Sequence, residues 1–299
     1  MFPPAANEAL SDWSRGNLNE KEFLDRAGWY ESWGFPWVLY RDLFLELRDK
    51  RLPARGINVT REQRKLGGEG TLDPALREEV GDLDLNVEPH RRYLSDVLTD
   101  SGHPDNPSFD SPEFLRFLRI QVLWDHVMGV RAAKLVQAGS SRAVVVVLIG
   151  SGHLEYKLGA NLRAARARPD LPQITLLDRF VLPEETGPEG RTTVPVGLAD
   201  FVRVERQTEL GAKPGSLSQL RLSAAPAGVK VDSARAFPDG AVEAFKPGDL
   251  IQSLNSKAYT DPIELRLAYE TIPPNGSADW TILREGKPLR FKTPIHSKD

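Results

Sequence analysis

A histidine and a tyrosine follow directly on a long apolar run. The segment Ala143–Ile149 leads into Gly-Ser-Gly, then His153, and Tyr156 comes three residues later. An imidazole can act as a base, ligate a metal ion or ligate haem iron, and a tyrosinate can ligate ferric haem. Each residue also has a plainer explanation, in which His153 caps a turn and Tyr156 lies at a domain edge with its hydroxyl in water.

A second set of candidate residues lies on one face of a predicted helix. The helix is predicted over residues 111–138, because a serine N-cap and a proline precede the helical pattern. Positions i, i+3, i+4 and i+7 on one of its faces are Gln121, Trp124, Asp125 and Met128. Trp124 and Met128 form an apolar wall suited to a flat macrocycle, or simply part of the core. Asp125 and Gln121 are candidates to orient His153.

The elements around His153 predict an α/β layer. The apolar run at 143–149 does not alternate, so it predicts a strand buried on both faces. The pattern continues with a helix and two more strands, at 158–170, 173–182 and 199–206. A strand that ends in Gly150-Ser-Gly152 places His153 at the carboxyl edge of the sheet, where α/β folds bind ligands. The two glycines permit close backbone approach and unusual dihedral angles.

The remaining segments predict helices at one end of the chain and short strands at the other. Residues 1–50 have an aromatic-rich helical pattern, with a helix start after Asn19, and residues 54–60 predict a short strand. The stretch 207–219 has the composition of a linker. Beyond it, short apolar runs and turn residues predict a small β-rich domain with one helix, capped by Asp261.

Composition excludes several kinds of chemistry. The 299 residues include no cysteine, so disulfides, thiolate metal sites and thiol catalysis are ruled out. The net charge is −3, and nothing in it requires a nucleic-acid partner or an anionic membrane. The first thirty residues carry no signal-peptide pattern, and the longest apolar run is too short to cross a bilayer.

The N-terminal two thirds resemble the ChaN-like haem-binding lipoproteins of the Tiki/TraB and erythromycin-esterase-like superfamily. Members carry a Gln-x-x-Trp-Asp-x-x-Met helix, a strand that ends in Gly-x-Gly-His, and a turn that contains tyrosine. The matching residues here are Gln121, Trp124, Asp125, Met128, Gly150, Gly152, His153 and Tyr156. Upstream, Asn58, Arg61 and Glu62 also stand at matching places, and the resemblance extends over residues 1–206.

The resemblance implies a haem (Fe-protoporphyrin IX) protein of iron or haem uptake, with haem as partner and a possible homodimer. An axial tyrosine in the family implies Tyr156 as iron ligand. Arg163 is a candidate partner for a haem propionate, or part of a solvated basic helix face. The haem contacts would be His153, Tyr156, Met128, Trp124 and Arg163, supported by Gln121, Asp125, Gly150 and Gly152. The family also implies a periplasmic or outer-membrane-anchored location in a bacterium.

The start of the chain departs from the family pattern. Members begin with a strand that carries Gly-Glu-x-His, followed by a helix and a second strand. This chain begins with a segment that looks like the end of that second strand. We therefore expect the first βα unit to be missing, either by truncation or because the start lies at an internal methionine.

Residues 214–296 resemble a PDZ domain. The most specific element is Pro-Gly-Asp-Leu-Ile at 247–251, where Asp249 can tie the turn through its side chain. PDZ domains add a peptide as an extra strand and hold its terminal carboxylate in a backbone nest. The segment at 215–223 lacks the usual Gly-hydrophobic-Gly pattern for that nest, so the module either binds a peptide or protein partner or only supports packing.

The predicted organisation is therefore an α/β ChaN-like domain at 1–206, a linker at 207–213 and a β-rich PDZ domain at 214–296. Haem binding is the first hypothesis for function. The alternatives are a metal-dependent hydrolase or protease like the Tiki proteins, which needs a second histidine or carboxylate, and a non-catalytic scaffold.

Overall fold

The chain forms two compact units. In the computed structural model the described residues are 2–100, 108–136, 144–181, 192–206, 216–234, 244–273 and 276–295. One unit comprises Met1–Ala5 with Gly56–Arg206, and the other comprises Ala6–Arg55 with Gln207–Asp299. The division differs from the predicted one in that residues 6–55 belong with the C-terminal part. The predicted linker at 207–213 lies outside the described residues.

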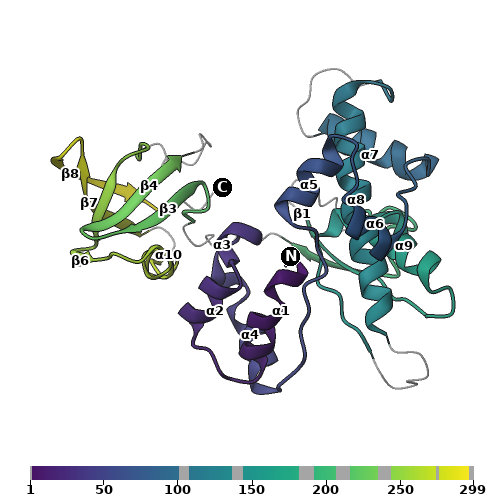
Figure 1. Cartoon of the computed structure of the whole chain (residues 1–299), viewed down its shortest axis with the longest axis horizontal. Coiled ribbons are helices and arrows are strands. Elements are labelled where there is room, and N and C mark those ends of the chain that lie inside the picture. The colour runs from purple at the N-terminus through teal and green to yellow at the C-terminus, as the bar shows by residue number, and fades with distance from the viewer. Residues whose placement is uncertain are drawn as a thin grey trace. The chain divides into compact units, whose positions relative to one another are not determined.

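A long helix organises the first unit. Helix α8 (Pro112–Leu135) starts as predicted, because the Ser111 hydroxyl accepts from the Phe114 N–H and Pro112 needs no partner for its own nitrogen. Four helices pack against it (Figure 1): α5 (Arg61–Gly68), α6 (Pro74–Val80), α7 (Glu88–Asp100) and α9 (Ala160–Ala167). The predicted helices at 111–138 and 158–170 are confirmed, with ends a few residues inside those expected.

Close packing of α8 on α9 depends on a glycine. A Cβ on Gly129 would lie 2.3 Å from the carbonyl oxygen of Ala160, far inside van der Waals contact. A second glycine, Gly67, lets α5 approach the Leu123 side chain on another face of α8. The backbones touch at Gly129, and at Gly67 a side chain packs directly on the backbone, so α8 is fixed against its neighbours by contact as well as by apolar burial.

The sheet of the first unit has two parallel strands in the described residues. Strand β1 (Leu176–Val181) pairs with β2 (Phe201–Arg206), and Leu176 is opposite Phe201. These strands confirm the predictions at 173–182 and 199–206, apart from their ends. Two short 3-10 turns, η3 (Ser151–His153) and η4 (Glu155–Lys157), connect to α9.

The predicted central strand at 143–149 is wrong for its described part. Residues 144–149 form no strand, and the exposed fractions of Val144 and Val146 are 85% and 87%. Valine favours a strand only where neighbouring strands pair with the backbone and cover the side chains. Within the described residues, no strand pairs with this segment. Residue Ala143 lies outside the described part of the chain.

The short strand predicted at 54–60 is also absent. This segment is extended and without strand pairing, but the Asn58 N–H donates to the carbonyl of Phe2. Asn58 is buried, its side chain accepts from the Val59 N–H, and its carbonyl accepts from Arg131. Arg131 in turn forms a paired contact with Glu79, so polar bonds rather than a strand ladder hold the segment.

The C-terminal part of the second unit contains a six-stranded antiparallel sheet (Figure 1). Its main path runs β3-β4-β5-β7-β8, with β6 paired to β5. The strands are β3 (Leu220–Ala225), β4 (Gly228–Ala234), β5 (Leu250–Leu254), β6 (Lys257–Ala258), β7 (Ser277–Arg284) and β8 (Lys287–Pro294). Helix α10 (Pro262–Glu270) follows β6, and the Asp261 side chain caps it as predicted.

Asp249 ties the turn before β5 in the way the sequence predicted. The buried carboxylate accepts from the Lys246 N–H at 2.8 Å and from the Arg284 guanidinium at two atoms. Burial opposes ionisation, but these partners hold the pKa of Asp249 below its usual range. Gly248, at φ +92°, supplies the left-handed step that lets the turn close.

The N-terminal helices of the second unit enclose an aromatic core. They are α1 (Asn7–Ser14), α2 (Glu20–Arg26), α3 (Trp29–Ser32) and α4 (Arg41–Asp49), with short turns η1 (Pro4–Ala6) and η2 (Trp37–Leu39). Asn19 caps α2 with a reciprocal bond from Glu22, as predicted. The aromatic core consists of Trp13, Phe23, Trp29, Trp37 and Phe44, which meet mostly edge to face, with a tilted pair at Phe23 and Phe44.

Helix α10 is bound to these N-terminal helices by a buried carboxylate. The Glu270 side chain accepts from the Trp37 N–H at 2.7 Å. One turn earlier, Arg266 lies under the Tyr30 ring, 4.8 Å from its centre, and donates to the carbonyls of Leu217 and Leu220. Burial outweighs these bonds and raises the pKa of Glu270 to about 7.

Replacement Glu270→Gln should therefore change how stability depends on pH. A raised folded pKa means that the carboxyl stabilises the fold at low pH, and that this contribution is lost as pH rises from about 4.5 through about 7. Relative to wild type, we expect the variant to gain up to about 3 kcal/mol at pH 8 compared with pH 4. Urea unfolding followed by tryptophan fluorescence measures this, because only Trp124 lies in the other unit. An unchanged difference between the two proteins across this range would contradict the expectation.

Candidate functional site

The imidazole of His153 is held by a carboxylate from the long helix. The η3 turn begins after Gly150, and the His153 N–H donates to the Gly150 carbonyl at 3.0 Å. The ring nitrogen Nδ1 lies 2.8 Å from Oδ1 of Asp125 on α8. This is the contact that the helix spacing predicted. The His153 side chain is 12% exposed, so one edge of the ring reaches the surface.

Asp125 lies between two histidines. Its second oxygen, Oδ2, is 3.2 Å from Nε2 of His90 on α7, and both side chains are 1% exposed. The alignment of this second contact is poor for a hydrogen bond, and His90 Nε2 has no better partner in the described part of the chain. Burial opposes ionisation, yet the two imidazoles hold the pKa of Asp125 below its usual range. The carboxylate is therefore charged in the interior.

Arg163 completes a buried polar row and does not reach the surface. Its Nη2 lies 3.0 Å from His90 Nδ1, and its Nη1 donates to the carbonyls of Leu158 and Gly159. The residue is 3% exposed, and burial lowers the pKa of its guanidinium. Neither expectation for Arg163 therefore describes this geometry, since both the propionate contact and the solvated helix face need an exposed cation.

The predicted apolar wall is only partly available to a ligand. The Trp124 ring is half-buried and meets the His153 ring edge to face, with 5.7 Å between centroids. Met128 is 1% exposed and belongs to the interior of the unit, as the plainer interpretation of the stripe held. Gln121 is half-buried, and no hydrogen bond joins it to His153 among the described residues.

Tyr156 is presented to solvent by a strained turn. Its backbone has φ +54°, and Lys157 follows at φ +57°, in the left-handed region that few non-glycine residues occupy. The turn is fixed because the Tyr156 N–H donates to the Leu198 carbonyl at 2.9 Å and Lys157 pairs with Asp200. The Tyr156 side chain is 39% exposed.

An open depression lies beside Tyr156. It has a volume of about 530 Å³ and is lined by Pro89, Arg92, Tyr93, Asp96, Val97, Asp100, Glu155 and Tyr156. The Tyr93 and Tyr156 rings meet at 5.8 Å, and the Tyr93 hydroxyl donates to Glu155 at 3.0 Å. Burial and the Glu155 charge raise the pKa of Tyr93, so that phenol stays protonated. His153 is not among the lining residues, so the structure does not place it on the same wall as Tyr156.

The sequence predicted close backbone approach at Gly150 and Gly152, but the structure has it at another glycine. Gly150 has φ −62°, and a Cβ there or on Gly152 would meet only atoms at 3.7 Å. At Gly159, by contrast, a Cβ would lie 2.1 Å from the His153 carbonyl oxygen and 3.1 Å from Asp125 Oδ1. Close backbone approach is therefore required at Gly159, just before α9.

Two residues of the site were not found from the sequence. His90 and Tyr93 are three positions apart on α7, so they share one helix face, and their rings are nearly parallel. A Glu-Pro helix start at 88–89, followed by an i, i+3 pair of rings, was the available signal. His126, which points away from this face, is half-buried and lies 2.8 Å from the Val80 carbonyl.

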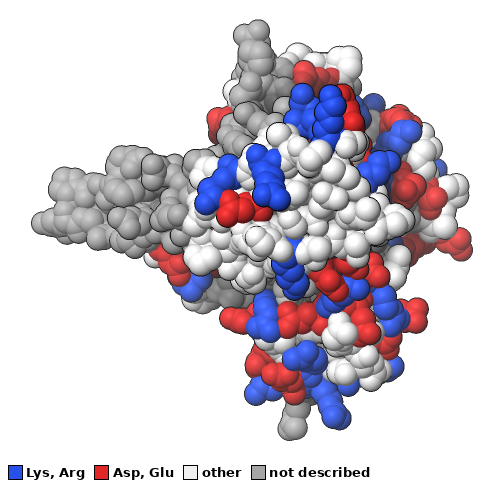
Figure 2. Space-filling model, turned by 90° about the vertical axis from the view of Figure 1, so that its left-hand side faces the viewer, with Lys and Arg blue, Asp and Glu red and all other residues white. Residues whose placement is uncertain are grey.

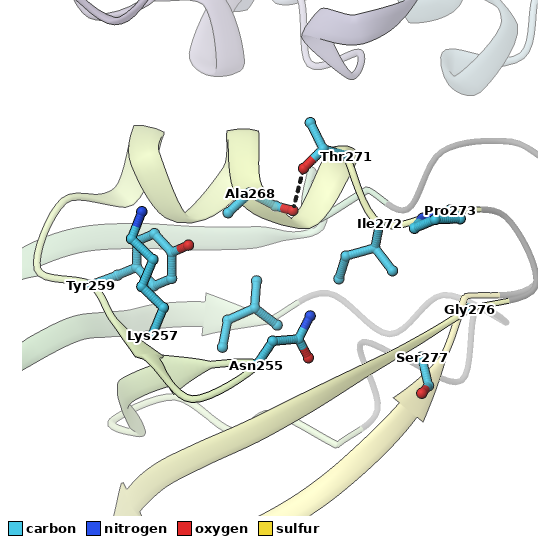
Figure 3. Close-up of a pocket in the computed structure, with 10 residues that line it drawn as sticks. Asn255, Lys257, Tyr259, Ala268, Thr271, Ile272, Pro273, Gly276 and Ser277 are labelled. Atoms are coloured by element: carbon cyan, nitrogen blue, oxygen red, sulfur yellow. Dashed lines mark hydrogen bonds between the residues drawn. The ribbon is translucent and has the colours of Figure 1, made fainter.

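The second unit has a depression of another kind (Figure 3). It has a volume of about 580 Å³ and lies between the turn after β5, the end of α10 and the start of β7. Lys257 lies over the Tyr259 ring, and Ile272 supplies an apolar wall. This depression has one cation and several hydroxyls, but it holds no paired acid and base among its described residues.

Surface charge and metal-ligand geometry do not single out a further site. On the face in Figure 2, basic and acidic side chains are interspersed with neutral surface. Among the described residues, no group of three His, Asp or Glu side chains is placed to hold a metal ion. No helix in that part of the chain is long and apolar enough to cross a membrane.

The first unit is an α/β arrangement that holds a histidine on a buried carboxylate and, separately, a tyrosine-lined depression. The model of one family, described as haem-binding uptake, Tiki superfamily, ChaN, matches residues 1–163. Since this is more than half of the 299 residues, the chain belongs to that family. A comparison with curated proteins gave no match.

Replacement Gly159→Ala should damage the site and Gly150→Ala should not. The first places a methyl group against the His153 backbone, so we expect a loss of about 2–3 kcal/mol in the free energy of unfolding. The second has an allowed φ and ordinary contacts, so its effect should stay within about 0.5 kcal/mol. Urea unfolding followed by far-UV circular dichroism compares them. Equal effects would show that the close approach at Gly159 is not a constraint.

Proposed function

We propose that the protein binds haem for uptake or handling, with the Tyr156 phenol as axial ligand. The observation that carries the proposal is the placement of Tyr156, a partly exposed phenol on the wall of a depression, held by strained backbone. Strain of this kind persists where the surrounding structure enforces it, and it is concentrated at functional sites. Membership of the haem-binding uptake family supports haem as the bound group.

Part of the lining suits this group, while Asp96, Asp100 and Glu155 add three carboxylates to the same depression. The depression has the size of a small-molecule site, with apolar surface from Pro89 and Val97 and ring surface from Tyr93. Arg92 is the cation on its lining that would pair with a propionate. Bound haem would supply a ferric centre for a tyrosinate, and Tyr93, which stays protonated, would remain a neutral ring beside it.

His153 has a different part in this proposal. Because His153 does not line the depression, we assign the iron to Tyr156, and we propose a polar contact for His153 only where the bound group extends beyond the depression. The buried Met128 and Arg163 act through packing and through His90 rather than by contact with haem. An open depression leaves one face of a flat ligand uncovered, and we propose that a second copy of the chain covers it.

Haemin titration of Tyr156→Phe tests the assignment. Wild type should shift and sharpen the Soret band. The variant should bind haemin at least about tenfold more weakly, because even the residues that hydrogen-bond to a metal ligand typically change affinity by about 10–100-fold. Tyr40→Phe is the matched control, because it removes a hydroxyl in the other unit and should bind like wild type. Equal haemin affinity in all three proteins would overturn the assignment, and no Soret shift in wild type would overturn haem binding. Gel filtration with haemin tests the dimer.

We further propose that residues 214–296 form a PDZ-like interaction module. The support is the order of elements, from β3 through the Asp249 turn and α10 to the β7–β8 hairpin. In its described loop before β3, the N–H groups of Leu220 and Ser218 donate within the loop, and the carbonyls of Leu217 and Leu220 accept from Arg266. We therefore propose that a partner binds without a carboxylate nest.

Paired peptides test this second proposal. A set of fluorescent peptides is prepared with a free C-terminal carboxylate and as the C-terminal amide, and anisotropy with the full chain is measured. We expect any peptide that binds to bind equally well in both forms, because Arg266 is already saturated by backbone carbonyls. A preference of about tenfold or more for the carboxylate would show that a nest exists.

A further inference from the structure

Donors and acceptors alternate in a fixed order along the row Arg163–His90–Asp125–His153, in which the His90–Asp125 contact is close but not aligned as a hydrogen bond. The guanidinium of Arg163 can only donate, because it has no acceptor atom and keeps its proton in proteins. Its Nη2 lies 3.0 Å from His90 Nδ1, so that nitrogen must be the acceptor. His90 is consequently neutral, with its proton on Nε2, which is the nitrogen that faces Asp125 at 3.2 Å.

The direction continues through the carboxylate. Asp125 is ionised and can only accept, so its Oδ1 accepts from Nδ1–H of His153 at 2.8 Å. The buried charges balance, since the Arg163 cation and the Asp125 anion are separated by one neutral imidazole. Asp84 and Arg166 lie further along the same side and pair with each other, and the Tyr93 ring lies parallel to His90.

We infer that this row places the proton of the neutral His153 tautomer on Nδ1 and leaves a lone pair on Nε2, and that His90 is a positioning residue for it. The exposed edge of His153 is therefore an acceptor, suited to a hydrogen-bond donor on a bound ligand or to a Lewis-acidic one. The row forms without haem. In the polar contact proposed above, His153 would therefore be the hydrogen-bond acceptor.

His90 matters because it decides how an amide at position 125 would turn. In Asp125→Asn, the side-chain oxygen must face the Nε2–H of His90, which Arg163 keeps in place. The amide N–H₂ then faces His153 Nδ1 and forces the proton to the other nitrogen. If His90 is also replaced by leucine, the amide is free to turn either way and the preference is lost. A residue that only filled space at position 90 would not have this effect.

Long-range ¹H–¹⁵N correlation spectra of the full chain at a pH where the histidines are neutral measure the tautomers directly. His153 is assigned by the signals lost in His153→Gln. In wild type we expect at least about a tenfold excess of the Nδ1–H form, the ratio expected from one hydrogen bond to a charged group. His90 should show the Nε2–H form. His126 is the internal control, because Nε2 must donate to the Val80 carbonyl and should do so in every variant.

The variants then separate the possible outcomes. Asp125→Asn should invert the His153 tautomer, and Asp125→Asn with His90→Leu should give a mixture. Wild-type His153 in the Nε2–H form, or His90 in the Nδ1–H form, would overturn the inference even if the variants fail to fold. A double variant that keeps the inverted form would show that His90 does not position the row. Because no haem is added, failure here is distinct from failure of the proposed function.

Discussion

The first unit is arranged around one buried carboxylate. Asp125 lies in the middle of α8, and a charged carboxylate in the interior is strongly unfavourable unless it is paired and hydrogen-bonded. Its partners come from different elements, since His90 is on α7 and His153 is the last residue of η3, and the Arg163 behind His90 is on α9. The polar row therefore specifies which elements contact α8 and where along the helix they do so. Apolar packing alone would allow more than one such arrangement.

Glycines make this row geometrically possible. Gly129 lets α9 approach α8, and Gly159 lets the chain before α9 pass against the His153 backbone and Asp125. A larger residue at either place would separate the elements that carry Arg163 and His153 from the helix that carries Asp125. The close backbone contacts at the glycines and the polar row therefore depend on each other, because both require the same short distance between α8 and the elements that carry His153 and Arg163.

The sequence predicted helices well and the central strand badly, for a physical reason. Helix α8 has local signals, a cap at Ser111 and an apolar stripe, and these are satisfied within the segment itself. A strand has no such independence, because residues 144–149 need neighbours that the described residues do not provide. The contact of Asp125 with His153 could be anticipated, since a lone carboxylate on an apolar face needs a partner. His90 could not, because its role depends on how α7 packs.

Burial also explains why two predicted haem contacts have other tasks. By spacing, Met128 shares a helix face with Trp124, and Arg163 belongs to a helix with several basic residues. Spacing does not show whether such a face points inward or outward. In the structure Met128 fills the interior, and Arg163 lies 3.0 Å from Nδ1 of the buried His90. Tyr156 and His153 reach the surface because they are on irregular turns between elements, anchored at Leu198 and at Asp125. Loops placed by a rigid scaffold are where binding residues concentrate. The two residues proposed to contact a ligand, His153 and Tyr156, are thus on turns. The helices, which gave most of the sequence signal, determine where those turns lie.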